Sequence, residues 1–184
     1  MKLMIASDIH GSAYYCRMLM EAFKEEGADR LLLLGDILYH GPRNDLPKDY
    51  APKEVFAMLN AQKSKIFAVR GNCDTEVDQM VLEFPIMAEY AVFTAGSHLI
   101  YASHGHHYNR HNPLPFQKGD IMLCGHTHVP AWEDFGQDNI YLNPGSVSIP
   151  KDGSPYSYMT LEKGNFIWKN LESGGEYHLL ELDN

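Results

Sequence analysis

The sequence predicts an α/β fold in which two β-sheets pack face to face with helices outside, and two observations predict it. In the first half of the chain, apolar strands alternate with helices, an order that produces a parallel sheet with crossover helices. In the second half, strands follow one another and are separated by Gly, Pro and Asn turns. A chain of 184 residues, 45% of them hydrophobic, suits one domain with a substantial core, which we assign to residues 1–184.

The first half contains three predicted strands and two predicted helices. The strands cover residues 2–8, 30–36 and 64–72, and the helices cover residues 13–28 and 52–62. The second strand, RLLLLGD, is apolar on both faces, as expected of a buried parallel strand. Ser12 is a suitable N-cap for the first helix, and Gly27 ends that helix.

The second half begins with a predicted hairpin over residues 88–105, which turns at Gly96–Ser97. Further strands are predicted within residues 120–126, 139–146, 156–170 and 176–182. A Pro-rich polar segment, here called the 39–52 loop, connects the second strand to the second helix. Its composition and length predict a functional loop or lid.

The charge balance excludes several partners. The formal net charge is −9, with 24 acidic against 15 basic residues, which argues against a groove for polymeric nucleic acid. A small phosphate ester could bind if bound cations supplied the positive charge.

The first apolar run is too short for a signal peptide, and no stretch approaches the roughly 20 apolar residues of a membrane span. Three cysteines without framework spacing argue against a disulfide scaffold, so a cytoplasmic location without membrane contact is predicted.

Five short polar motifs follow the predicted strands: SDIHG, LGD, RGNCD, SHGHH and CGHTH. The carboxyl ends of strands in an open α/β sheet share one edge, where ligands bind, so the motifs are expected to converge on one site. Their candidate ligands are Asp8, His10, Asp36, Asn72, His104, His126 and His128, with His106 as a further candidate. Carboxylate, imidazole and amide oxygen suit a borderline-hard divalent metal.

The spacing of these residues favours two metal ions. Residues two apart in an extended chain point the same way, so Asp8 with His10, and His126 with His128, can each present two ligands to one pocket. Seven ligands are too many for one tetrahedral ion but suit two ions that share a bridging carboxylate. A single motif of this kind occurs often by chance, and a lone Asp after a strand is more often a cap or turn residue. Five such motifs in order on strand ends favour a site.

In order and residue type, the motifs resemble the calcineurin-like metallophosphoesterase superfamily, whose pattern is D-x-H, G-D, G-N-H-[DE], H and G-H-x-H. The match runs from residue 5 to 128, and the GNCD variant and small size are similar to a compact bacterial and archaeal phosphodiesterase branch related to a retromer coat subunit. The resemblance implies a four-layer α/β/β/α sandwich with a dinuclear centre at one edge of the sheets. It also implies a structural role for residues 145–184, which carry none of the metal motifs.

The resemblance further assigns the ligands. It implies that one ion is held by Asp8, His10 and His128, that the other is held by Asn72, His104 and His126, and that Asp36 bridges both. The expected cofactors are two divalent ions, manganese first, with zinc, iron or nickel as alternatives. The expected reaction is hydrolysis of a small phosphodiester by direct attack of a metal-bridging hydroxide, with no covalent enzyme intermediate.

Two other readings are weighed against this one. A non-catalytic metal-binding interaction scaffold is the alternative from another class, but scaffold members would be expected to lose ligands, and this chain keeps all seven. A metallo-β-lactamase-type hydrolase needs H-x-H-x-D-H, which the sequence lacks. The physiological ester stays open, as does assembly of identical chains.

The candidate catalytic residues are Asn72, Cys73 and His106. In most of the superfamily, a histidine that assists the leaving oxygen or steadies the phosphate stands where this chain has Cys73. A thiol is a weak hydrogen-bond donor, so it should serve poorly there, and either Cys73 or His106 could assist. Arg43 and Arg110 are candidate substrate-binding residues through a guanidinium fork, with an ordinary surface arginine as the alternative for each.

Overall fold

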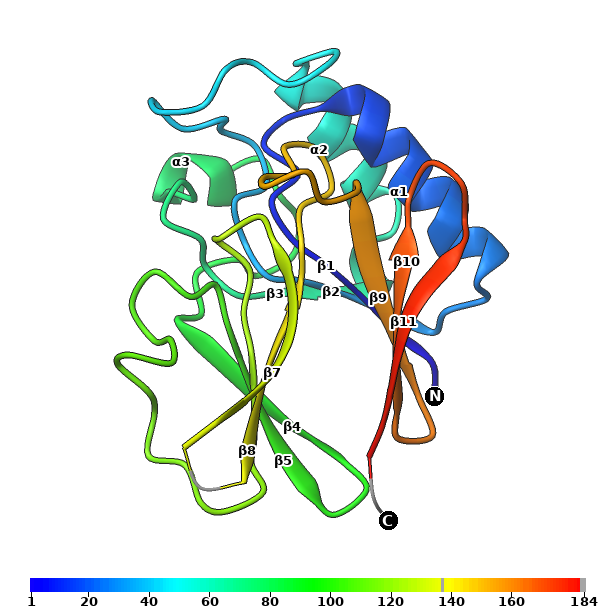
Figure 1. Cartoon of the computed structure of the whole chain (residues 1–184). Coiled ribbons are helices and arrows are strands. Elements are labelled where there is room, and N and C mark those ends of the chain that lie inside the picture. The colour runs from blue at the N-terminus through cyan, green and yellow to red at the C-terminus, as the bar shows by residue number, and fades with distance from the viewer. Residues whose placement is uncertain (137, 183–184) are drawn as a thin grey trace.

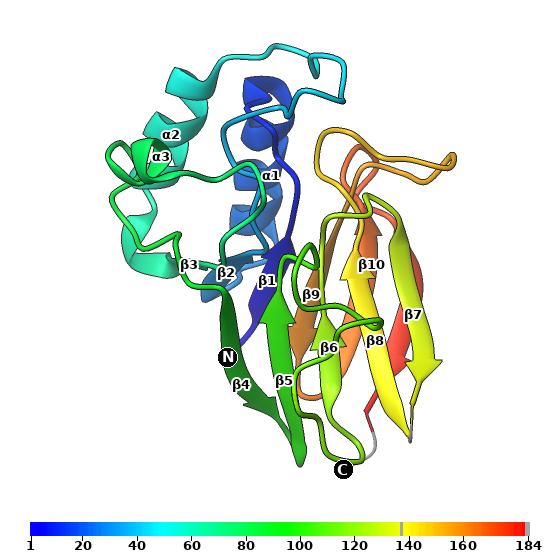
Figure 2. The ribbon, with the colours of Figure 1, turned by 90° about the vertical axis from the view of Figure 1, so that its left-hand side faces the viewer.

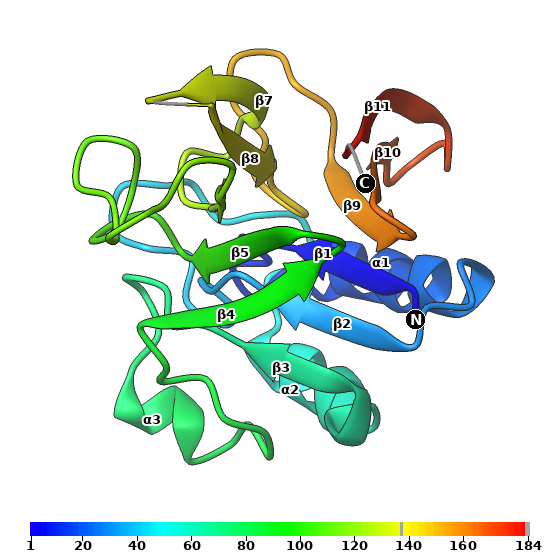
Figure 3. The same ribbon diagram turned by 90° about the horizontal axis from the view of Figure 1, so that it is seen from below.

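The computed structural model describes residues 1–136 and 138–182, and its framework is a pair of stacked β-sheets (Figure 1). The six-stranded sheet has the order β11-β10-β9-β1-β2-β3, and the five-stranded sheet has the order β4-β5-β6-β8-β7. Figure 3 shows the two sheets from below as separate layers, with α1 and α2 outside the six-stranded one. This is the predicted α/β class.

The described elements have the following bounds. The strands are β1 (Leu3–Ala6), β2 (Arg30–Leu33), β3 (Ile66–Ala68), β4 (Tyr90–Ala95), β5 (His98–Ser103), β6 (Ile121–Leu123), β7 (Pro130–Phe135), β8 (Asn139–Pro144), β9 (Ser157–Glu162), β10 (Asn165–Asn170) and β11 (Glu176–Glu181). The helices are α1 (Ala13–Glu25), α2 (Pro52–Asn60) and α3 (Glu76–Gln79), with a 3₁₀ turn at Lys63–Lys65.

The strand–helix–strand order of the first half produces the expected parallel pairing. β1 pairs with β2 in parallel, and β2 pairs with β3 in parallel, because α1 and α2 return the chain to the same edge. On its other side β1 pairs antiparallel with β9, so strands from the far end of the chain complete the sheet. Ser12 caps α1 by accepting a hydrogen bond from the backbone of Tyr15, and Gly27 follows the helix with φ +60°, as predicted.

Alternate side chains of the central strands enter two different cores. On β2, Leu31 and Leu33 are buried against the helices, while Leu32 is buried between the sheets. Trp168 of β10 fills the inter-sheet core, and its indole N–H donates to the carbonyl of Asn143 at 2.7 Å. A strand apolar on both faces is therefore buried on both faces, as the leucine run predicts.

The outer face of the five-stranded sheet is covered by a loop. Met122, Cys124 and Tyr141 are buried there, with Phe116 of the 105–120 connection packed against them. Within the described chain this connection contains no helix, which differs from the helical fourth layer that the resemblance implies. Pro113 and Pro115 explain the difference, because proline interrupts helical hydrogen bonding.

The sequence-based assignment lacked the edge strand β7 and the single-turn helix α3, and it read residues 156–170 as one strand where the structure has β9 and β10. β7 begins at Pro130, a residue tolerated only at the edge or start of a strand. As for membrane insertion, every helix in the described part of the chain falls short of the length and apolar character needed for a span.

Candidate metal centre

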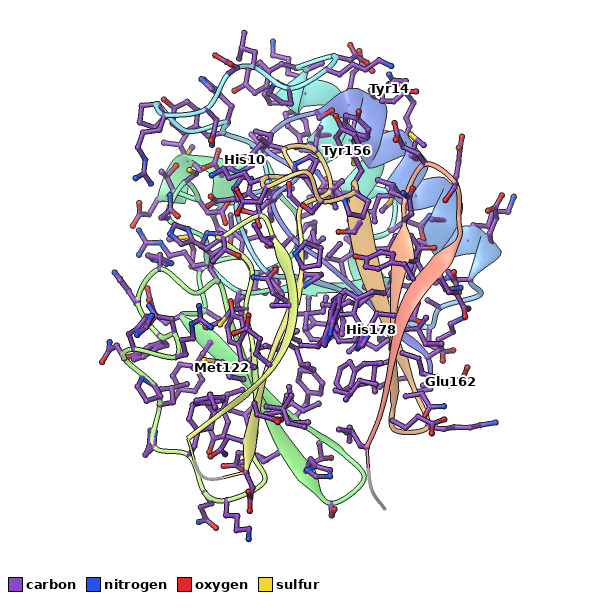
Figure 4. The ribbon with its side chains drawn as sticks, in the orientation of Figure 1. His10, Tyr14, Met122, Tyr156, Glu162 and His178 are labelled. Atoms are coloured by element: carbon purple, nitrogen blue, oxygen red, sulfur yellow. The ribbon has the colours of Figure 1, made fainter. Side chains whose placement is uncertain are left out.

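The five motifs meet where strands of both sheets end. Asp8, Asp36 and Asn72 follow β1, β2 and β3 of the six-stranded sheet, while the histidines of SHGHH and CGHTH follow β5 and β6 of the other sheet. A hydrogen bond joins the strand ends of the two sheets: the backbone N–H of His126 donates to the side-chain Oδ2 of Asp8 at 3.1 Å. Figure 4 shows His10 at this end of the molecule, far from Met122 and His178.

The first ligand cluster consists of Asp8, His10 and His128, all buried. Asp8 Oδ1 lies 3.5 Å from His10 Nε2 and 3.3 Å from His128 Nε2. The two Nε2 atoms are themselves 3.3 Å apart. One side-chain atom of each residue therefore points at a common position.

The second cluster lies beside the first and is more open to solvent. His104 Nε2 is 3.1 Å from Asn72 Oδ1, 3.1 Å from His126 Nδ1 and 3.4 Å from Asp36 Oδ2. The same Asp36 oxygen lies 3.8 Å from His10 Nε2 of the first cluster. Asp36 thus stands between the clusters, in the position that a bridging carboxylate requires.

Backbone carbonyls fix three of the imidazole rings. The Nδ1–H groups of His10, His104 and His128 donate to the carbonyls of Tyr39, Leu34 and Ile149 at 2.8, 2.6 and 2.6 Å. A histidine that donates from Nδ1 keeps a free lone pair on Nε2, which is the arrangement of a metal ligand oriented by its surroundings. All three Nε2 lone pairs are consequently turned to the centre.

These groups fit a bound cation. Asp8 Oδ1 is buried and has no hydrogen-bond partner among the residues that the structure describes, and the facing Nε2 atoms of His10 and His128 are both acceptors. Only a proton or a metal cation between such atoms removes their repulsion. Burial alone would lower the pKa of His104, yet Asp36 and Asp8 raise it to about 9, so the carboxylates attract positive charge to this position. The donor set suits two divalent ions.

The neighbours of Asp36 hold it in place. Asp74 is buried and accepts three backbone N–H hydrogen bonds, from Asp36 at 2.8 Å, Ile37 at 2.9 Å and Gly71 at 2.7 Å. Gly71 must lack a side chain, because a Cβ there would lie 2.2 Å from Asp36 Oδ1. Asp74 was not among the predicted site residues, although the fourth position of the GNCD motif was a signal for it.

Cys73 lies at the wall of the centre. Its backbone N–H donates to Asp36 Oδ1 at 2.8 Å, and its sulfur accepts from Asn72 Nδ2 at 3.2 Å, which turns the amide oxygen of Asn72 toward His104. Burial and Asp36 raise the pKa of the thiol well above its usual range, so the sulfur is uncharged. The sulfur also lies within 4.8 Å of ligand atoms of His10 and Asp36.

A pocket of about 450 Å³ opens over the clusters. Among its lining residues are Arg43 and Asn44 of the 39–52 loop and Lys151 from the far end of the chain. Lys151 was not among the predicted site residues. It comes from residues 145–184, which the resemblance assigns a structural role but which also supply the Ile149 carbonyl to His128.

Two other candidates lie farther from the ligands. Arg110 is not brought to the pocket: it pairs with Glu133 of β7 and lies over the ring of Tyr141, 5.5 Å from its centroid. The centroid of the His106 ring lies 5.4 Å from that of His104, and its buried Nδ1 has no hydrogen-bond partner among the described residues. Burial and the nearby histidines lower the pKa of His106 to about 4, so it is neutral near pH 7.

The family of the chain follows from comparison with known proteins. A family model described as the calcineurin-like phosphoesterase superfamily domain matches residues 1–165, and the chain therefore belongs to this superfamily. Phosphodiesterase YfcE of Escherichia coli (strain K12) is 48% identical to it over 162 residues, 88% of each chain. The predicted family and the predicted enzyme class, a phosphoesterase, are confirmed.

Solved structures agree on the fold. The structure of the E. coli phosphoesterase YfcE covers the whole of both chains with a TM-score of 0.95 and 43% identity. A structure of Vps29 from Entamoeba histolytica also covers both chains completely, with a TM-score of 0.62 at 20% identity, and it shares the fold alone. The predicted metallophosphoesterase fold is thereby confirmed.

Proposed function

We propose that this protein is a phosphodiesterase that hydrolyses small phosphodiesters at a centre of two divalent metal ions. The observation that carries the proposal is the buried Asp8 Oδ1, which has no hydrogen-bond partner in the described part of the chain and is faced by two imidazole acceptors. Such an arrangement is stable only around positive charge. The activity named for the E. coli relative, which is similar over most of its length, supports the same reaction here.

The ligands divide between the two ions as the clusters do. Asp8, His10 and His128 would hold one ion, Asn72, His104 and His126 the other, and Asp36 both. When bound, the ions would neutralise charge on the phosphoryl oxygens and lower the pKa of the attacking water. Manganese is the expected metal, with zinc, iron or nickel as alternatives.

Other side chains position the substrate. The Arg43 guanidinium and the Lys151 amine line the pocket and would balance the negative charge of the diester. Cys73 orients the Asn72 amide and, because its thiol is uncharged, is not the attacking group. Neutral His106 would donate a hydrogen bond from its single ring N–H to a phosphate oxygen, but near pH 7 it lacks the second proton with which an imidazolium protonates a leaving oxygen.

The assay is hydrolysis of bis-p-nitrophenyl phosphate with and without metal. Activity should disappear on chelation and return when manganese is added. Loss of a residue that only orients a metal ligand typically costs about 10- to 100-fold in activity or metal affinity. Asp36 is proposed to be a ligand itself, so Asp36→Asn should lower kcat by more than about 100-fold and weaken binding of both ions. Asp45→Asn makes the same chemical change on the exposed surface of the 39–52 loop and should behave as wild type.

The scaffold alternative predicts a different outcome of this assay. A metal-binding scaffold would take up manganese without hydrolysing any diester. Loss of one ion with activity retained in Asp36→Asn would instead contradict the bridging role. Metal content by mass spectrometry, measured beside the rates, separates the two results.

A further inference from the structure

A second pocket, of about 350 Å³, lies next to the one at the metal centre. Cys73 belongs to the walls of both, so the two pockets are neighbours across a single side chain. The other walls come from the 39–52 loop, the first turns of α2, and α3 with its flanking residues. Figure 2 shows α2 and α3 on the same side of the molecule, with the 39–52 loop above them.

The two pockets differ in chemistry. The metal pocket is lined by charged and amide side chains, whereas the second is lined mainly by aromatic and aliphatic ones, including Tyr39, Tyr50 and Phe56. Besides the tyrosines and the Cys73 thiol, the polar side chains among the described lining residues are Thr75 and Asp78. Both are engaged with each other, because Asp78 Oδ2 accepts from the N–H of Thr75 at 2.8 Å and from its hydroxyl at 2.9 Å. The second pocket is thus suited to an apolar group.

The exposure of its apolar walls supports a ligand. Val77 is 70% exposed and Tyr39 is 42% exposed, and both face the same hollow. Single exposed apolar residues are ordinary, but a concave set of them beside a polar reaction site is typical of ligand subsites. Gly41, with φ +81°, lies against Cys73, the residue that separates the two pockets. A Cβ at Gly41 would lie 3.2 Å from the Cys73 sulfur and would narrow the passage between the pockets.

We infer that the second pocket binds an apolar esterifying group of the substrate, so that the preferred substrates are asymmetric phosphodiesters with one polar and one apolar alcohol. The inference rests on the proposed function. With the phosphate at the metal ligands, one ester group extends along Arg43 and Lys151, and the other extends over Cys73 toward Phe56 and Val77. Removal of the apolar group from water adds affinity that the polar side cannot supply.

Alkyl methyl phosphates with chains from methyl to octyl are suitable probes. They carry the same diester anion, and because they release no nitrophenolate they compete with a chromogenic substrate without contributing to its signal. They are tested as competitive inhibitors of methyl p-nitrophenyl phosphate hydrolysis by the manganese-loaded protein, and by calorimetry. The inhibition constant should fall roughly two- to fourfold per methylene until the pocket is filled.

Val77→Asp tests the location. It adds a second carboxylate to the wall, in place of an apolar side chain beside Asp78, and should weaken binding of octyl methyl phosphate at least about tenfold, while dimethyl phosphate binds as before. Met80→Asp is the matched control, since Met80 is 84% exposed, lies three residues away and is not in the wall. Both variants add one negative charge to the same segment.

The inference is overturned if wild-type affinity does not depend on chain length, or if Val77→Asp and Met80→Asp weaken every probe equally. Failure of the proposed function looks different, because metal-loaded protein would then hydrolyse no diester. Calorimetry with the same series still decides whether the pocket binds alkyl groups in that case.

Discussion

Five of the metal-ligand candidates share a backbone conformation that residues other than glycine rarely adopt. Their φ angles lie between +48° and +68°; they are Asp8, His10, Asp36, His126 and His128. A non-glycine residue held in this left-handed region costs about 1 kcal/mol or more and persists only where the surroundings impose it. The sharp turns after the strands direct these side chains toward the centre. Interactions elsewhere in the fold compensate for the conformational cost of the turns.

The strain can be measured at His126 by comparing glycine with alanine. Both variants remove the imidazole, but glycine adopts positive φ without penalty, so metal-free His126→Gly should be about 1 kcal/mol more stable than His126→Ala in urea unfolding. The same pair at exposed Lys24 of α1 should give the opposite order, because glycine destabilises a helix. The same order at both positions would argue against strain at His126.

The Asp74 carboxylate supports the turn at Asp36. Asp74→Asn replaces one oxygen by an NH₂ group that faces backbone N–H donors, so the variant should lose about 2–3 kcal/mol of unfolding free energy and most of the activity. Asp78→Asn is the control, since Asp78 lies nearby and caps only the exposed start of α3. Unchanged stability of Asp74→Asn, with the metals still bound, would show that the carboxylate charge is dispensable.

At the scale of elements, a small ionic network joins both ends of the chain. Glu26, just after α1, accepts hydrogen bonds from Lys2 before β1, from Tyr158 of β9 and from Lys169 of β10. Burial alone would raise the pKa of Glu26, but Lys169, Lys2 and Tyr158 together lower it. The network therefore connects the helix layer to the strands that complete the six-stranded sheet.

The lowered pKa of Glu26 predicts an acid-sensitive contribution to stability. A carboxyl whose folded pKa is depressed stabilises the protein above its unfolded pKa of about 4.3, and this contribution is lost as pH falls through the folded value. Glu26→Gln should therefore cost about 1–2 kcal/mol at pH 7 and progressively less below pH 4. Glu54→Gln, which removes the exposed partner of Arg17, should change stability by less than about 0.5 kcal/mol at either pH.

At the scale of the molecule, the candidate centre is assembled from both sheets. One set of ligands follows strands of the six-stranded sheet, and the histidines of SHGHH and CGHTH follow strands of the other. Ions held there would join the two sheets at their upper end in Figure 1. Metal binding should consequently stabilise the fold as a whole.

Metal removal should therefore lower the melting temperature. Ligand at 100 times its dissociation constant stabilises a folded state by about 2.7 kcal/mol, and chelation should remove this amount. Asp36→Asn, which lacks the shared carboxylate, should respond much less to added manganese. Equal melting temperatures for loaded and chelated wild-type protein would contradict a metal site that spans the sheets.

Local patterns were sufficient for most of the regular elements and for naming candidate ligands. The alternation of strands and helices, the Ser12 cap and the Gly96–Ser97 hairpin are properties of near neighbours in the chain, and the structure agrees with each. The sequence pattern did not predict β7, because an edge strand with charged residues lacks the apolar alternation of a buried strand. The covering of the five-stranded sheet by a loop likewise depends on packing rather than on local preference.

The sequence by itself determined which side chains stand at strand ends, and hence the metal-binding chemistry and the superfamily. Only the tertiary structure decided which groups complete the site. Lys151 reaches the pocket and Arg110 does not, because β7 holds Arg110 through Glu133 while the chain after β8 returns beside His128. The carbonyls that orient the histidines, and the apolar pocket behind Cys73, come from segments far apart in sequence. Contacts of this kind depend on how the sheets stack, which no local pattern encodes.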